Sequence, residues 1–191
     1  MNDVQRQLLK AEEFAGFTAD DFLWMTKVGA FSDMAGKIEL VDGVITRMSP
    51  AKVSHFHYTR QVFHQLNDIF GYEGRDGYIV GQVPSFQLST ISVREPDVAI
   101  LRSPELADGW IPGDHLLLAV NVADTSLADD KGPRRLCYAR ALIPNYWVVD
   151  VNGRVIEAWS DPADGDYRQH RTIPFGEPVP VPGTDQTITL N

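Results

Sequence analysis

Residues 116–151 read LLLAVNVADTSLADDKGPRRLCYARALIPNYWVVDV. The runs at 116–123 and 145–151 are mostly apolar, which is typical of buried strands. Residues 126–142 between them predict a helix. Two strands joined by a helix run parallel in one sheet, with a right-handed crossover. The segment therefore predicts an α/β or α+β fold with a central mixed sheet flanked by helices.

The residues on either side extend this pattern. Thr18, with Asp21 three residues later, predicts a capped helix at 18–29. Asp42-Gly43 and Asn152-Gly153 each separate two apolar runs, which predicts two hairpins. Pro84 favours an edge or a bulge in its strand. We expect further helices at residues 3–14 and 52–70, and strands at 78–88, 94–101, 167–173 and 186–190.

The chain has 191 residues, which suggests one domain. Within it we expect an N-terminal helical extension at 1–36, a core at 37–160 and a Pro- and Gly-rich β tail at 161–191. The formal net charge is −9, which argues against a protein coated in nucleic acid but permits a local basic groove.

Cysteine content and hydropathy bear on the compartment. Cys137 is the single cysteine and lies in an apolar stretch, so a buried thiol is favoured over a nucleophile. A chain with one cysteine fits a reducing compartment. The N-terminus has no apolar signal core, and no run reaches the roughly 18 apolar residues of a membrane span. We predict a cytoplasmic protein with no membrane partner.

Four polar residues stand in apolar surroundings: Glu39, Asp97, Asn121 and Arg134. Buried charges cost several kcal/mol unless they are paired or metal-bound. Each residue also has an ordinary explanation. Glu39 could face solvent by strand alternation, Asp97 could cap the turn after a proline, Asn121 could bond a nearby loop, and Arg134 could belong to a solvated helix face.

Taken together, the four suggest chemistry. An acid, a polar residue on the next strand and then a cation form the layout of a metal-dependent phosphodiesterase. Carboxylates hold Mg²⁺ through oxygen, and the metal polarises a phosphate and lowers the pKa of bound water. By spacing alone this signal is weak, because Pro-Asp pairs are common.

Four stretches then resemble a known family in order and spacing: IELVDGVITRMSP at 38–50, REPDVAIL at 94–101, LLLAVNVADTS at 116–126 and RRLCYARALIPNYWVVD at 134–150. They are similar to the large bacterial family of putative restriction endonucleases with a PD-(D/E)XK nuclease-like fold. The resemblance covers about residues 37 to 160. It implies a restriction endonuclease-like core and Mg²⁺- or Mn²⁺-dependent cleavage of DNA phosphodiesters.

The resemblance also implies roles for residues. Asp97 falls on a metal ligand and Glu39 on a further ligand or orienting group. Asn121 falls on the second acidic ligand, and Arg134 on the lysine of the following helix. His55 and Asp130 fall on accessory positions.

The sequence departs from the family where charge matters most. Asn121 offers an oxygen to a metal but no charge, and Arg134 cannot deprotonate. Ala123 stands where the lysine of the standard motif would lie, and Asn145 replaces a third family carboxylate. Asp124 could replace the lost acid if the strand ends before it; otherwise it faces away or caps the next helix. These departures predict a degraded active site.

Two functions remain open from the sequence: an impaired metal-dependent endonuclease, and a catalytically inactive binding or scaffold protein on a nuclease fold. For either we expect weak DNA binding by a patch of Lys131, Arg135 and Arg140. We also expect a homodimer, since cutting both strands of a duplex usually needs two sites.

Overall fold

The computed structural model describes residues 16–48, 52–82, 84–103 and 108–191. The helix expected at residues 3–14 lies outside these ranges. Helix α2 (Ala19–Lys27) begins after Thr18, as predicted. The Thr18 hydroxyl accepts a hydrogen bond from the Asp21 backbone N–H, and the Asp21 carboxylate accepts one from the Thr18 N–H. These two bonds satisfy backbone donors that a helix start leaves free.

The strands form two mixed sheets and a two-stranded ribbon. The smaller sheet has the order β2-β1-β5-β4-β7, with bounds β1 (Ile38–Val41), β2 (Val44–Arg47), β4 (Phe86–Ser89), β5 (Ser92–Arg94) and β7 (Ile111–Pro112). The larger sheet has the order β11-β10-β9-β8-β6-β3, with bounds β3 (Tyr78–Gln82), β6 (Val98–Arg102), β8 (Leu116–Ala123), β9 (Asn145–Asp150), β10 (Val155–Ala163) and β11 (Asp166–Pro174). The ribbon pairs β12 (Val179–Pro180) with β13 (Thr187–Ile188).

The mixed α/β architecture agrees with the sequence, but the single central sheet does not. Several passages of the chain between the sheets lie near a proline, and two of them divide segments expected to be continuous. Pro84 lies between β3 and β4, and Pro96 lies between β5 and β6. Proline lacks the N–H that a ladder needs, so a strand ends or changes partners there. The strand expected at 78–88 is accordingly two strands in different sheets.

The predicted hairpins and the strand–helix–strand unit are present. In the first hairpin Asp42 and Gly43 both have positive φ, 47° and 81°, as a two-residue turn between twisted strands requires. Strands β8 and β9 pair in parallel and are joined by the predicted helix. That helix consists of α4 (Leu127–Asp129), a wide turn at Asp130–Arg134 and α5 (Arg135–Arg140), with non-helical angles at Gly132.

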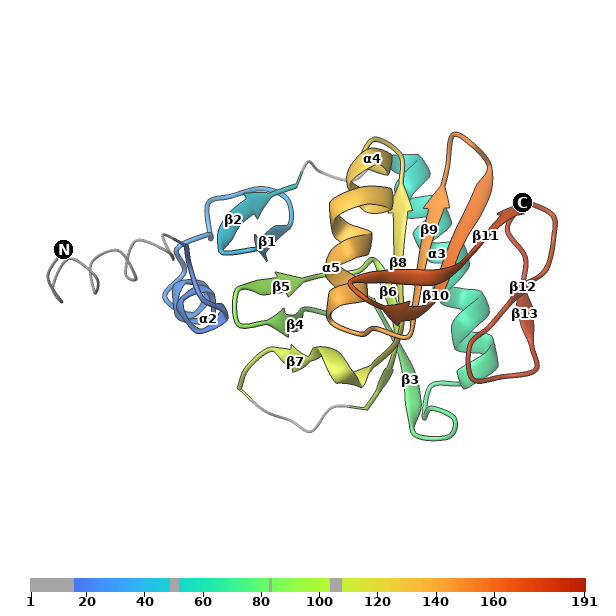
Figure 1. Ribbon diagram of the computed structural model, residues 1–191, viewed down its shortest axis with the longest axis horizontal. Coiled ribbons are helices and arrows are strands. Elements are labelled where there is room, and N and C mark those ends of the chain that lie inside the picture. Colours follow the sequence, from blue (N-terminus) through green and yellow to red (C-terminus); the bar gives the residue numbers. More distant parts are fainter. Residues whose placement is uncertain (1–15, 49–51, 83, 104–107) are drawn as a thin grey trace, which may run out of the picture.

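The central strands of the larger sheet, β6, β8 and β9, are covered on both faces (Figure 1). Helix α3 (Val53–Phe70) places Val62, Leu66 and Phe70 against one face, where the C-terminal ribbon also packs. Helix α5 covers the opposite face through Tyr138. Side chains alternate along a strand, so Ala119, Asn121 and Ala123 of β8 share the α5 face. This alternation directs the one polar residue of β8 toward the helix that follows it.

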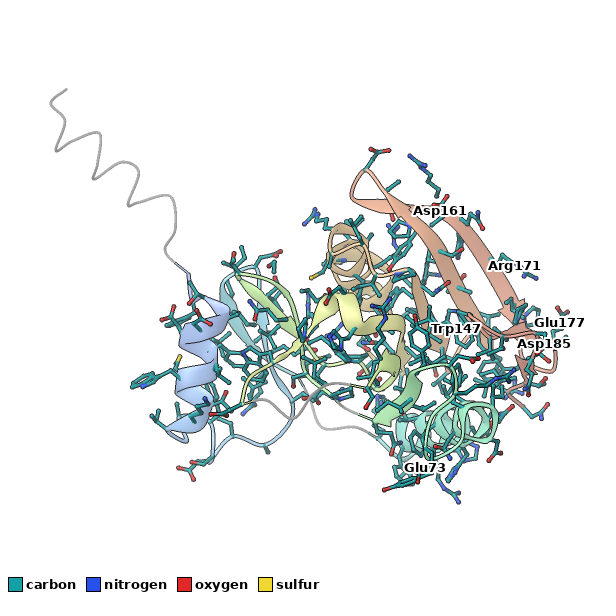
Figure 2. The ribbon with its side chains drawn as sticks, turned by 90° about the horizontal axis from the view of Figure 1, so that it is seen from below. Glu73, Trp147, Asp161, Arg171, Glu177 and Asp185 are labelled. Carbon is teal, nitrogen blue, oxygen red and sulfur yellow. The ribbon has the colours of Figure 1, made fainter. Side chains whose placement is uncertain are left out.

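Helix α2 and the first hairpin lie to one side of the larger sheet (Figure 1). The β10–β11 hairpin forms one edge of that sheet, with Asp161 near its turn (Figure 2). Strand β10 runs across the boundary expected at residue 160. No helix of the described residues is long and apolar enough to cross a membrane.

Candidate active site

A pocket of about 520 Å³ lies where the smaller sheet meets β8 and the helix after it. Asp97 and Asn121 both line it. Val98 pairs with Val120, so the preceding residue Asp97 lies opposite Asn121. The Asp97 N–H donates to the Val120 carbonyl at 2.9 Å. The acid and the amide that the sequence singles out are therefore adjacent.

The Asp97 carboxylate is buried and has three donors. Lys37 Nζ lies 2.8 Å from Oδ1, His55 Nε2 lies 3.1 Å from Oδ2, and the Val122 N–H donates to Oδ2 at 2.8 Å. Burial raises the pKa of Asp97, but the His55 hydrogen bond and the Lys37 charge outweigh it and lower the pKa to about 2. Asp97 is thus a carboxylate that is already neutralised by protein groups.

Lys37 is the site residue that sequence reasoning missed. It comes just before β1 and also donates to the Glu95 carbonyl oxygen at 3.0 Å. Its position two residues before Glu39 was the available signal, because residues two apart in a strand share a face. What the sequence did not reveal is that this face of the first hairpin turns toward Asp97.

Asn121 is held on one side only. Its Nδ2 donates to Asp130 Oδ1 at 3.2 Å, whereas its buried Oδ1 has no partner among the described residues. Asp130 also accepts from Ser126 Oγ at 2.5 Å and lies 3.0 Å from Arg134 Nε. Burial raises the pKa of Asp130 despite the Arg134 charge. Asp130, accessory in the sequence prediction, is the link between the amide and the arginine.

Arg134 turns its guanidinium to Glu39. Nη1 and Nη2 donate to the two oxygens of that carboxylate, each at 2.9 Å. Arg94 Nη1 and the Glu95 N–H donate to the same carboxylate at 3.1 and 2.9 Å. Burial raises the pKa of Glu39, but the charges of Arg134 and Arg94 lower it by more, so the net shift of the pKa is downward. With four donors around it, Glu39 has no free oxygen lone pair directed at a cation.

The remaining predicted residues divide between this pocket and the surface. His55 joins Asp97, while Arg134 reaches Asn121 only through Asp130. Asp124 follows directly after the end of β8 and lines the pocket, where Ser54 Oγ donates to it at 2.6 Å. The condition under which Asp124 could face the site is therefore met.

The expected basic patch is mostly paired with acids. Lys131 lies 2.5 Å from Glu157, and Arg135 forms an ion pair with Asp166. Arg140 is exposed at the end of α5. Two of the three cations therefore contribute little net charge to this surface.

A divalent metal, which the family resemblance implies, does not fit the donor set as it stands. In the part of the chain that the structure describes, no three His, Cys, Asp or Glu side chains gather where they could hold a metal ion. Asp97 faces an ammonium group, and the Asn121 oxygen brings no charge. Mg²⁺ loses its water reluctantly and relies on carboxylates to offset that cost.

Fold and site together define the class: a mixed α/β protein whose two sheets meet at a buried acid–base cluster beside a polar pocket. Residues 20–191 match the Uma2 family, described as "Putative restriction endonuclease". The chain belongs to this family, which confirms the resemblance stated from the sequence.

A solved structure agrees. The chain is similar to a putative nuclease belonging to DUF820 from Anabaena variabilis, with a TM-score of 0.63 and 15% sequence identity. The similarity covers 87% of this chain and 89% of that one. At this identity the likeness establishes the fold. No curated protein matches the chain.

The Glu39–Arg134 pair should matter for stability. We predict that Arg134→Lys lowers the free energy of unfolding by roughly 2 kcal/mol, because an ammonium cannot donate to both carboxylate oxygens in one plane. Urea denaturation measures this loss. Arg168→Lys is the matched control, since Arg168 pairs with Asp164 at the surface, and it should change stability by less than about 0.5 kcal/mol. Equal effects of the two variants would contradict the prediction.

The lowered pKa of Asp97 predicts a pH dependence. Because the folded pKa is about 2 and the ordinary pKa of an aspartate is 3.8, the ionised carboxylate stabilises the fold above about pH 4. The contribution, about 2 kcal/mol, is lost as the pH falls toward 2. Urea titrations of the parent and Asp97→Asn at several pH values should show their stability difference shrinking below pH 4. A difference that stays constant from pH 6 to pH 3 would argue against this pairing.

Proposed function

We propose that this chain is a restriction endonuclease-like protein whose metal-dependent cleavage of DNA is impaired. The observation that carries the proposal is the pairing of Asp97 with Lys37 and His55 beside an amide at position 121. Family membership supports the nuclease origin of the scaffold. The chemistry of the pocket supports the loss of activity, because only one of the predicted acidic ligands faces it without an arginine partner.

The impairment has a simple electrostatic basis. A metal held by Asp97 and the Asn121 oxygen would have ligands with a total charge of −1 before the Lys37 ammonium is counted. Asp124 also lines the pocket, but Lys52 lies 3.7 Å from its carboxylate. Glu39, the third predicted ligand, is balanced by Arg134 and Arg94. The local charge available to offset dehydration of Mg²⁺ or Mn²⁺ is therefore close to zero.

A second candidate is a catalytically inactive scaffold, and one observation favours it. The predicted catalytic residues Glu39 and Arg134 are both buried and join the smaller sheet to the helix after β8. Residues in such a buried pair stabilise the fold whether or not any chemistry remains. The two candidates differ in whether the pocket can still take a metal when charge is restored.

For DNA we propose a contact at the pocket rim. Arg47 and Lys52 are exposed and line the pocket that contains Asp97. Unlike Lys131 and Arg135 they line the pocket, and Lys52 lies 3.7 Å from Asp124 whereas Lys131 lies 2.5 Å from Glu157. The homodimer remains a proposal from the need to cut two strands.

Restoring the missing carboxylate tests the proposed function. Asn121→Glu should bind Mn²⁺ at least about tenfold more tightly than the parent, because a second carboxylate then stands opposite Asp97. It should also nick plasmid DNA faster than the parent. Arg134 is retained, since it holds Glu39. Calorimetric Mn²⁺ titration and a supercoiled-plasmid assay measure the two effects.

Asn121→Gln is the control, because it lengthens the side chain without adding charge. A parent that binds Mn²⁺ as tightly and cuts as fast as Asn121→Glu would show an intact site and end the proposal. A folded Asn121→Glu variant that gains neither property would favour the scaffold.

The DNA contact makes a separate prediction. Replacing Arg47 and Lys52 by Gln should reduce the slope of log K against log salt concentration by about 2, because each lost phosphate contact contributes about 0.9. Replacing Lys131 and Arg135 by Gln should change it less, since Glu157 and Asp166 already balance them. Fluorescence anisotropy with a short duplex measures the slopes. A larger loss of slope in the Lys131 and Arg135 variant than in the Arg47 and Lys52 variant would place the DNA contact at Lys131 and Arg135 instead.

A further inference from the structure

Lys37 occupies an unusual place in the pocket. Its ammonium lies 2.8 Å from Asp97 Oδ1 and 3.0 Å from the Glu95 carbonyl oxygen, with the Glu95 carboxylate 3.6 Å away. Its side chain is 24% exposed, and it lines the pocket. The ammonium is therefore fixed by oxygen atoms from one short stretch of chain, Glu95 to Asp97. This is the arrangement of oxygens around a bound cation.

The neighbouring Asn121 supplies a second observation. Its Oδ1 is buried, lies beside Asp97 on the pocket wall, and has no partner in the part of the chain that the structure describes. Buried oxygen atoms without partners are rare, because each costs desolvation free energy. Lys37 takes up the carboxylate charge but leaves this oxygen unused. The pocket wall thus has one acceptor, the Asp97 carboxylate, that binds the Lys37 ammonium, and a second, the Asn121 oxygen, that is open.

We propose that Lys37 is the resident cation of this pocket and keeps divalent metal ions away from Asp97. The proposal rests on the proposed function, in which metal-dependent cleavage is impaired. A metal that bound Asp97 Oδ1 would meet the ammonium at hydrogen-bond distance, and like charges that close repel strongly when partly buried. Metal binding therefore requires Lys37 to move away, which breaks both of its hydrogen bonds.

The proposal separates two causes of impairment. The amide at position 121 removes charge from the site, whereas Lys37 competes for the charge that remains. If the amide alone were responsible, removing Lys37 would change nothing. If Lys37 competes, its removal frees the carboxylate, and the open oxygen of Asn121 becomes a second ligand.

The test is Lys37→Met, which keeps the length of the side chain and removes its charge. Mn²⁺ binding is measured without DNA, by calorimetry and by the loss of the free-ion paramagnetic resonance signal. We expect at least about tenfold tighter binding than in the parent, with a melting temperature that rises with Mn²⁺ concentration. Asp97→Ala in the Lys37→Met background should abolish the gain.

Lys52→Met is the matched control. It removes the same charge from the same pocket, but Lys52 lies 3.7 Å from Asp124 and has no contact with Asp97. An equal gain in Lys52→Met would overturn the proposal, since the effect would then be one of general charge. Lys37→Gln replaces Lys37→Met if the latter does not fold, and a folded variant with no gain in affinity also overturns it.

Comparison with Asn121→Glu separates this proposal from the proposed function. If Asn121→Glu gains Mn²⁺ affinity and Lys37→Met does not, the site is impaired but Lys37 is not the competitor. If the parent already binds Mn²⁺ tightly and cuts DNA, the proposed function fails. A gain in both single variants, with a larger gain when they are combined, supports both.

Discussion

The arrangement of the two sheets and the helix after β8 depends on the ion pairs of the buried Glu39 carboxylate. Glu39 is 1% exposed and lies between two arginines that come from different elements, one at the end of β5 and one from the helix after β8. A carboxylate buried without such partners would cost several kcal/mol. The smaller sheet, the larger sheet and the helix must therefore keep their relative positions for this charge to be tolerated. The pocket lies at that junction.

The same constraint decides what the pocket can do. Once Arg134 is committed to Glu39, the cation that faces Asp97 has to come from elsewhere, and the first hairpin supplies Lys37. Lys37 lies two residues before Glu39, at the start of β1, so both side chains point to the same side. When Glu39 pairs with the arginines, Lys37 therefore lies next to Asp97. The pairing of Glu39 with Arg134 and the neutralisation of Asp97 by Lys37 both result from the packing of the first hairpin at this position.

Sequence reasoning reached part of this arrangement, for physical reasons that differ by residue. The placement of Asp97 and Asn121 in one site came from the family resemblance, because the spacing of the two residues alone is a weak signal. The parallel pair and the Asp42-Gly43 hairpin followed from local chemistry, namely apolar runs and a turn dipeptide. The division into two sheets did not, since Pro84 and Pro96 signal an interruption but not which strand pairs next. The Lys37–Asp97 contact joins the two sheets, and the Arg94–Glu39 contact joins neighbouring strands of the smaller sheet. Both contacts link residues far apart in the sequence, so local patterns do not specify them.

The scaffold therefore retains its shape for reasons independent of catalysis. An enzyme of this layout needs a net negative pocket for its metal, whereas a stable fold needs every buried charge balanced. In this chain each buried acid near the pocket has a cation: Glu39 has two arginines, Asp130 has Arg134, and Asp97 has Lys37. Balance that is complete within the protein leaves little negative charge for a metal. Among the described residues that line the pocket, Asn121 has a buried neutral oxygen without a partner, so a carboxylate placed at position 121 would change the charge of the pocket directly.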